Sequence, residues 1–86
     1  MSDVIKVKIY SIDFCPYCER AKSLLEMRKV PFKEIKIDRS NSEEVRELFS
    51  RSGMKTFPQI FADDRLIGGY TDLAKEDEQD QLASLL

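Results

Sequence analysis

The chain has 86 residues, a length that predicts one small domain, residues 1–86, with a single hydrophobic core. Hydrophobic residues make up 42% and charged residues 35% of the chain, which are the proportions of an ordinary folded domain and not of a disordered or fibrous one. The formal net charge of −2 provides no broad attraction to nucleic acid or to an anionic membrane, so neither partner is expected.

The residue types that are missing narrow the chemistry. The chain contains no histidine, which excludes Cys-His and Ser-His nucleophile pairs, imidazole general bases and histidine zinc sites. Its two cysteines, Cys15 and Cys18, cannot complete a four-cysteine metal site within one chain, so no metal and no permanently bound cofactor are expected. Of these reactive groups, the composition leaves the two cysteine thiols.

The use of cysteine also bears on the compartment. A secreted disulfide scaffold of this size would carry more cysteines at scattered spacings, so a reducing compartment is expected. Residues 1–3 lead into strand-like sequence without a signal peptide's basic start and apolar stretch, and no run of about 18 apolar residues follows. These observations predict a cytoplasmic protein.

The first part of the chain shows a strand period and then a helical period. Ile5, Val7 and Ile9 alternate with lysine and tyrosine, which predicts a strand that buries one face and ends near Ser11. Residues 16–28 follow a helical period instead. The buried arc of this helix is expected to hold Cys18, Ala21, Leu24 and Leu25.

A second strand and helix follow. Val30-Pro31 ends the first helix, and residues 32–38 predict a strand. Residues 40–44 offer overlapping capping boxes for a helix that Gly53 ends. The apolar stripe of this second helix consists of Val45, Leu48 and Phe49.

The last third of the chain predicts a hairpin and a helix. Residues 59–62 and 65–68 form two short apolar runs around an Asp-Asp turn, and Gly68-Gly69 permits a second tight turn. From Thr71 to the end the chain is expected to be helical. The core-facing candidates of this last helix are Leu73, Leu82, Leu85 and Leu86.

The predicted element order, β-α-β-α-β-β-α, defines an α/β fold class. The first crossover requires a parallel pair of strands and the hairpin an antiparallel pair, so the central four-stranded sheet is expected to be mixed. Helices should flank this sheet on both faces.

Cys15-Pro16-Tyr17-Cys18 lies where the first strand passes into the first helix. Unpaired backbone N–H groups and the positive end of the helix dipole stabilise a thiolate at such a position. Cysteines in such settings have pKa values of roughly 3.5–7.5 instead of about 8.5, so Cys15 is expected to be a nucleophile near neutral pH.

Cys18 lies one turn into the helix, on its buried arc, and should be shielded while still reaching the Cys15 sulfur. This geometry assigns Cys15 as the attacking thiol and Cys18 as the resolving thiol of a redox couple. The alternatives are an incidental buried cysteine pair and a metallochaperone that binds copper or zinc through two thiolates. The prolines and the predicted hairpin do not fit a metallochaperone.

Three separated motifs spread over nearly the whole chain: Cys15-Pro16-Tyr17-Cys18 with Arg20-Ala21, Thr56-Phe57-Pro58-Gln59-Ile60-Phe61, and Gly68-Gly69-Tyr70-Thr71-Asp72-Leu73. Together, in this order, they resemble the motifs of small dithiol glutaredoxins of the bacterial type. Thioredoxins proper match less well, because they are usually longer and carry a Trp-Cys-Gly-Pro-Cys motif, and this chain has no tryptophan.

The resemblance implies a thioredoxin-like fold and an activity. The activity is that of a glutathione-dependent thiol–disulfide oxidoreductase, which reduces glutathionyl mixed disulfides and protein disulfides through Cys15 and Cys18, with glutathione as co-substrate. It also implies a monomer whose partners are disulfide-bearing or glutathionylated proteins, with ribonucleotide reductase among them. Two alternatives stay open: a relative recharged by thioredoxin reductase, and a module that holds an iron–sulfur cluster with glutathione.

The resemblance further implies a glutathione site around Cys15. Pro58 would be cis and turn the backbone of Phe57 toward the cysteine part of glutathione, Tyr17 would flank the glutathione sulfur, and a segment near Gly69 would hold the γ-glutamyl end. The residues implied in this site are Tyr17, Thr56, Phe57, Pro58, Gly69, Thr71 and Asp72. Simpler roles stay open, because Pro58 could begin a strand, Thr71 and Asp72 could cap a helix, and Tyr17 could cover the core.

The surroundings of this site differ in part from the family pattern. Lys55 and Arg51 are candidates for the glycine carboxylate of glutathione, although both could be ordinary surface charges. Ile12 replaces a frequent lysine, Phe57 replaces a common valine, and Phe14 lies where a small polar residue is frequent. The rim of the site is therefore expected to be more apolar than usual, which would change the substrate preference.

Overall fold

The computed structural model describes residues 5–79 and contains four strands and three helices in the predicted order. The elements are β1 (Val7–Ser11), α1 (Pro16–Met27), β2 (Phe32–Lys36), α2 (Ser42–Ser52), β3 (Gln59–Ala62), β4 (Arg65–Gly68) and α3 (Tyr70–Glu78). The predicted core leucines Leu82, Leu85 and Leu86 lie outside the described residues. No helix in residues 5–79 has the length and apolar character needed to cross a membrane.

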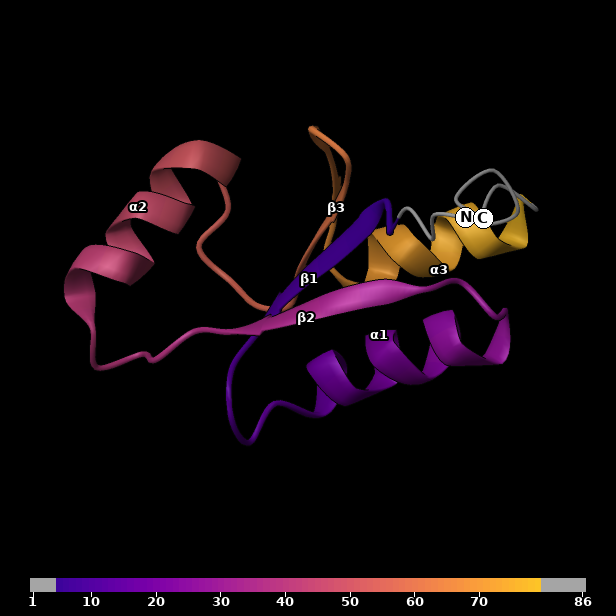
Figure 1. Ribbon diagram of the computed structural model, residues 1–86, viewed down its shortest axis with the longest axis horizontal. Coiled ribbons are helices and arrows are strands. Elements are labelled where there is room, and N and C mark those ends of the chain that lie inside the picture. Colours follow the sequence, from indigo (N-terminus) through magenta and orange to yellow (C-terminus); the bar gives the residue numbers. More distant parts are fainter. Residues whose placement is uncertain (1–4, 80–86) are drawn as a thin grey trace.

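The strands form one mixed sheet in the order β2-β1-β3-β4 (Figure 1). β1 pairs in parallel with β2, with Ile9 opposite Glu34, and antiparallel with β3, with Ile9 opposite Ile60. β3 and β4 form the predicted hairpin, and Asp63 begins its turn with a φ of 55°. The mixed sheet predicted from the crossover and the hairpin is therefore confirmed.

The hydrophobic core lies between one face of this sheet and helices α1 and α3. Val7 and Ile9 of β1 are fully buried there, together with Leu25 of α1 and Leu73 of α3. α1 and α3 also contact each other. Arg28 at the end of α1 donates to both carboxylate oxygens of Asp77 in α3, at 2.7 and 3.1 Å, and so ties the two helices together.

Helix α2 lies on the other side, near the end of β1 from which the chain leads to Cys15 (Figure 1). The guanidinium of Arg51 in α2 lies 5.7 Å from the ring centroid of Tyr10, whose side chain alternates with the core residues of β1. Leu48 is the buried residue of this helix. Helices thus flank both faces, as expected.

The ends of the helices follow the predicted signals. Asn41 caps α2, accepting the N–H of Glu44 at 3.1 Å, and Gly53 ends α2 in the left-handed region with a φ of 73°. α1 ends at Met27, one residue before the predicted end, and α3 begins at Tyr70, one residue before the predicted start.

One prediction about the strands is wrong. The alternating pattern places Ile5 on the buried face, but β1 begins only at Val7 and 47% of the Ile5 surface is exposed. The predicted second strand also ends at Lys36 instead of Asp38, although the N–H of Ile37 still donates to the carbonyl of Ser11 at 2.7 Å. Alternation alone cannot locate a strand end, because pairing depends on the neighbouring strand.

Two residues of α1 test the location of the core. Leu25 is fully buried, whereas 67% of the Met27 surface is exposed. Leu25→Ala should lower the free energy of unfolding by about 2–5 kcal/mol, because it removes buried methyl groups and leaves a cavity. Met27→Ala should change it by less than about 0.5 kcal/mol. Urea unfolding of both oxidised variants measures the difference, and equal losses would contradict this core.

Candidate active site

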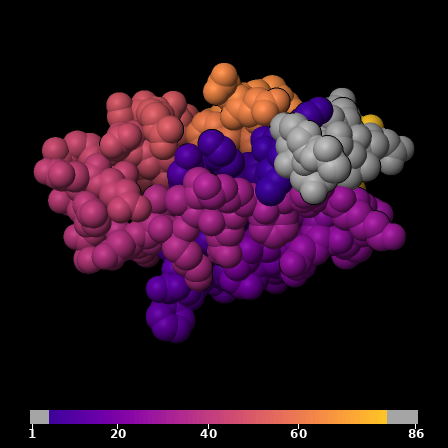
Figure 2. Space-filling model, in the orientation of Figure 1, coloured from indigo at the N-terminus to yellow at the C-terminus, as the bar shows by residue number. Residues whose placement is uncertain are grey.

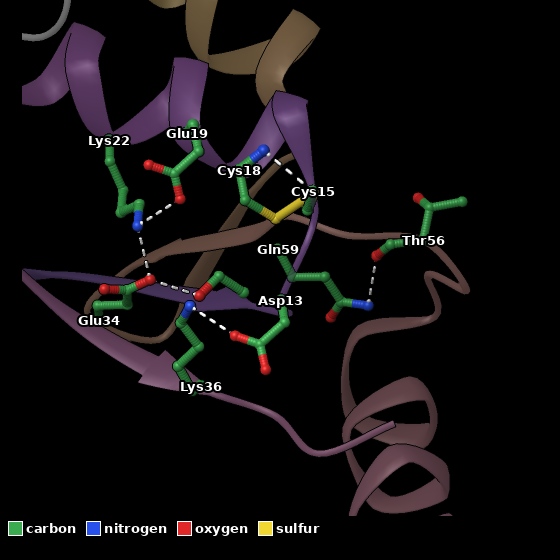
Figure 3. The surroundings of a disulfide bond; sticks show 10 residues. Asp13, Cys15, Cys18, Glu19, Lys22, Glu34, Lys36, Thr56 and Gln59 are labelled. Carbon is green, nitrogen blue, oxygen red and sulfur yellow. Dashed lines mark hydrogen bonds and ion pairs between the residues drawn. A yellow bond between two sulfur atoms is a disulfide. The ribbon is translucent and has the colours of Figure 1, made fainter. Parts of the chain in front are cut away.

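Cys15 and Cys18 form a disulfide at the first turn of α1 (Figure 3). Cys15 is the N-cap residue, Pro16 takes the first helical position, and the Cα atoms of the two cysteines are 5.2 Å apart. The N–H of Cys18 donates to the Sγ of Cys15 at 3.1 Å. A sulfur thus occupies the place of the usual capping oxygen, where backbone N–H groups and the helix dipole favour a negative charge.

The two sulfurs differ in access. Cys18 is fully buried on the arc that also carries Ala21 and Leu25, whereas Cys15 is partly exposed. A large substrate therefore reaches Cys15 first. The predicted order, with Cys15 attacking and Cys18 resolving, matches this difference in access.

A polar network holds the end of β1, from which the chain leads to Cys15. The hydroxyl of Ser11, which is fully buried, donates to Glu34 Oε2 at 2.6 Å, and the Nζ of Lys22 donates to the same oxygen at 2.9 Å. Lys22 also pairs with Glu19 at 2.8 Å. Figure 3 shows these contacts and the separate ion pair between Lys36 and Asp13, at 3.0 Å.

The network shifts the pKa values of its charged members. The hydrogen bond from Ser11 and then that from Lys22 lower the pKa of Glu34 below its ordinary value. The hydrogen bonds to Glu19 and Glu34 raise the pKa of Lys22. Glu34 is therefore ionised throughout the neutral range, and its charge holds the end of β1 at Ser11 and α1 at Lys22.

Beside the disulfide lies a groove of about 380 Å³ that brings the implied glutathione residues together. It is lined by Tyr17, Thr56, Phe57, Pro58, Gly69, Thr71 and Asp72, and also by Met54 and Tyr70. The first seven of these are the residues that the resemblance implied. They come from the start of α1, the loop before β3 and the start of α3, so the fold unites three separate motifs. We call this the first groove.

Sequence analysis did not select Met54 or Tyr70 for the site. The ring centroid of Tyr70 lies 6.1 Å from that of Tyr17. The guanidinium of Arg20 lies over the Tyr17 ring, 5.3 Å from its centroid. In the sequence Tyr70 lies between Gly69 and Thr71, two residues that the resemblance implies, and this position could have indicated that Tyr70 belongs to the site. Nothing in the sequence marks Met54.

A buried side chain holds the loop before β3. Gln59 is fully buried, and its Nε2 donates to the carbonyls of Met54, at 3.2 Å, and Thr56, at 3.0 Å. The peptide bond between Phe57 and Pro58 is cis, as the resemblance implied. The wall of the first groove is therefore fixed from within the protein.

The other wall of the first groove is the start of α3. The N–H of Gly69 donates to Asp72 Oδ2 at 3.0 Å, which holds this carboxylate at the first turn. The first main-chain bond of α3 runs from Leu73 N–H to the Gly69 carbonyl, so the earlier N–H groups, including that of Thr71, have no helical acceptor. Gly68 has a φ of 125°, and a Cβ atom at this residue would collide with Asp72.

A second groove, of about 350 Å³, shares Thr56 and Phe57 with the first. Lys55 and Arg39 contribute its cations, and Ile12 lies in its wall. Phe57 packs against Phe49 with the ring centroids 5.8 Å apart. Of the two cations predicted for the glycine carboxylate, Lys55 lies in this lining, whereas Arg51 contacts Tyr10 instead. Arg39 was not predicted.

The described residues contain no group of three or more cysteine, aspartate or glutamate side chains placed to hold a metal ion. Cys15 and Cys18 therefore stand as a dithiol couple at the start of a helix, beside a groove of polar and aromatic residues on a mixed sheet. This arrangement is that of thiol–disulfide exchange proteins of the thioredoxin-like class.

Comparison with known proteins gives the family. The sequence model of the glutaredoxin family matches residues 7–67, and the chain belongs to this family. It is 46% identical over 80 residues to glutaredoxin 3 of Escherichia coli strain K12, a match that covers 93% of this chain and 95% of that protein. It is 39% identical to glutaredoxin 1 of Rickettsia prowazekii strain Madrid E over 79 residues, which covers 91% of this chain and 83% of that protein.

A solved structure agrees with the fold. The solution structure of the dithiolic glutaredoxin 2-C-Grx1 from Trypanosoma brucei brucei superposes with a TM-score of 0.81 at 32% identity, covering 93% of this chain and 84% of that one. The protein is thus a glutathione-dependent thiol–disulfide oxidoreductase, and glutathione is its co-substrate.

The network beneath the Cys15 loop predicts a pH dependence of stability. The stabilisation from ionised Glu34 is fully present above the unfolded pKa of about 4.5 and is lost as the pH falls through the lower folded pKa. Glu34→Gln should therefore lower the free energy of unfolding by about 1–2 kcal/mol at pH 7. Urea unfolding from pH 7 to pH 2 should show this deficit shrinking in acid.

The matched control is Glu26→Gln, which changes an exposed glutamate of α1. This variant should follow the pH dependence of the unchanged protein. A Glu34→Gln deficit that stays constant down to pH 2 would contradict the role of the ionised carboxylate.

Proposed function

We propose that Cys15 is the attacking thiol and that glutathione binds in the first groove. The observation that supports this most strongly is that all seven residues implied by the resemblance line one groove beside the cysteine pair.

The reduction of a glutathionylated protein begins at Cys15. Its thiolate attacks the glutathione sulfur, the old disulfide breaks, and the protein substrate leaves as a thiolate that takes a proton from solvent. A second glutathione then attacks the Cys15–glutathione disulfide and releases oxidised glutathione. For a protein disulfide, Cys18 attacks the mixed disulfide at Cys15 and leaves the Cys15–Cys18 bond.

The parts of glutathione match the walls of the first groove. The γ-glutamyl carboxylate meets the free N–H groups at the start of α3, near Thr71, and the ammonium group meets Asp72. The main chain at Phe57 pairs with the cysteine part of glutathione, and Tyr17 flanks its sulfur. The glycine carboxylate extends into the second groove, toward Lys55.

Residues 1–86 act in this proposal as one domain and as a monomer, because one chain supplies both cysteines and the walls of the first groove. The protein substrates are disulfide-bearing or glutathionylated proteins in a reducing compartment, the cytoplasm, and ribonucleotide reductase is the family partner to test first. The chain has two closely spaced cysteines, whereas a secreted disulfide scaffold would carry more of them at scattered spacings, and this difference supports a reducing compartment.

Exchange of each cysteine separates their roles. Cys18→Ser should keep the reduction of a glutathionylated peptide within about threefold and lose most reduction of a protein disulfide, because only the second reaction needs a resolving thiol. Cys15→Ser should abolish both. The two rates are measured with glutathione and glutathione reductase, and either activity surviving in Cys15→Ser would reject the assignment.

Glycine at residue 68 tests the wall formed by α3. Gly68→Ala should raise the KM for glutathione about tenfold, because the new Cβ displaces Asp72, while alkylation of Cys15 in the reduced variant keeps its rate. The matched control is Gly53→Ala, which also places alanine at a positive φ but with no atom within 4 Å of its Cβ. If both variants bind glutathione equally well, Asp72 does not hold the ligand.

A further inference from the structure

The residue before Cys15 has an unusual exposure and an unusual backbone. The surface of Phe14 is 103% exposed relative to an extended reference, and its φ is 56°, in the left-handed region. Residues other than glycine rarely adopt such a φ, bulky ones least of all. Because the ring is in solvent, it contributes no hydrophobic stabilisation to the fold. Figure 2 shows the segment after β1 standing out from the surface, below the body of the molecule. The backbone thus holds an aromatic ring in solvent on the residue that precedes the reacting Cys15.

A third groove, of about 670 Å³, lies beside this ring. It runs between the Asp13–Phe14 loop and the segment that follows β2, and its lining residues are Asp13, Phe14, Lys36, Ile37, Asp38 and Arg39. Phe14 belongs to this lining and not to that of the first or the second groove. The ring therefore lies outside the site proposed for glutathione.

The charges of the third groove are partly satisfied within the protein. Asp13 and Lys36 pair with each other at 3.0 Å, and the Asp38 carboxylate accepts the Ser40 hydroxyl at 2.6 Å and its N–H at 2.9 Å. Arg39 is exposed, and no carboxylate within residues 5–79 forms an ion pair with it. The third groove thus offers one apolar anchor and one available cation.

The third groove adjoins the second groove through Arg39, and the second adjoins the first through Thr56 and Phe57. The three grooves are thus linked through the lining residues that they share, and a ligand that extends from Cys15 past Phe14 enters the third. Glutathione, a tripeptide, occupies the first groove and part of the second in the proposed function. A longer polypeptide joined to Cys15 has neighbouring residues that glutathione lacks.

We propose that Phe14 and Arg39 form a docking surface for the polypeptide part of a disulfide substrate. Its occupant is an extended segment with apolar residues next to the reacting cysteine, which cover the Phe14 ring, and an acidic residue that reaches Arg39. This inference rests on the proposed function, because it assumes a mixed disulfide at Cys15. It assigns to Phe14 the selection between protein substrates and leaves the binding of glutathione to the other two grooves.

An exchange equilibrium in the Cys18→Ser background measures this selection without turnover. The glutathione disulfide of Cys15 reacts with a peptide thiolate to give the peptide disulfide of Cys15 and free glutathione thiolate, so one S–S bond forms as another breaks. Two peptides with one cysteine each are compared, one with leucine and one with serine on both sides of it. The ratio of their exchange constants removes the contribution of glutathione.

The leucine peptide should be favoured about fivefold, which is the effect of covering part of one exposed aromatic ring. Phe14→Asn should reduce this ratio to about one, since asparagine accepts a left-handed φ while it removes the ring. Phe14→Leu should restore most of the preference. Met27→Ser, which removes another exposed apolar side chain of the first helix, should leave the ratio unchanged.

A second pair of peptides, with glutamate or glutamine two residues from the cysteine, tests Arg39. The glutamate peptide should be favoured about threefold at low salt, and Arg39→Gln should remove this preference while keeping that for leucine. A leucine-to-serine ratio near one in the parent, or a ratio that survives Phe14→Asn, would overturn the docking surface. Failure of Cys15 to form the glutathione disulfide at all would instead overturn the proposed function, and mass spectrometry of the starting adduct shows which has failed.

Discussion

The chemistry of this protein depends on one sulfur at the beginning of one helix. Cys15 caps α1 with its Sγ, which accepts the N–H of Cys18, and the dipole of twelve helical residues points at the same place. The helix end stabilises a thiolate formed there without help from a histidine, since the chain contains none. The rest of the structure positions this helix end and controls what can approach it.

Two kinds of support meet at the Cys15 loop. Beneath it, Ser11, Glu34 and Lys22 form a network of hydrogen bonds and an ion pair that fixes the end of β1 to β2 and α1. Beside it, Gln59 holds the carbonyls of the loop before β3. The hydrogen bonds of neither support involve the sulfur, yet both decide where the walls of the site stand. Preorganised walls matter, because thiol–disulfide exchange requires three sulfurs to approach a line.

Much of the fold could be predicted from the sequence, because its local signals agree with one another. The alternation of Val7 and Ile9, the Asn41 cap and the Gly53 stop each reflect short-range physics, and each is found in the structure. The start of the first strand at Val7 could not be predicted, because it depends on which residues β2 and β3 offer for pairing. Ile5 is exposed for that reason.

The residues of the site that belong to a short motif could be predicted from the sequence. The residues that only the fold brings to the site could not. Cys15 and Cys18 stand out by spacing, and the other implied residues by their resemblance to a family. Met54 and Arg39 have no such signal, since each reaches a groove only through the course of a loop. The exposure of Phe14 was equally hidden, because a left-handed φ at a phenylalanine follows no sequence rule.

The central claim is that the helix terminus activates Cys15 while Cys18 stays covered. The most direct measurement is the rate at which iodoacetamide alkylates each cysteine of the fully reduced protein between pH 4 and pH 10, with the modified residue identified by mass spectrometry. The account predicts that Cys15 is modified first, with its rate half-maximal below about pH 7.5. Two results would contradict it: half-maximal modification of Cys15 near the pKa of about 8.5 of an unperturbed thiol, or modification of Cys18 before Cys15.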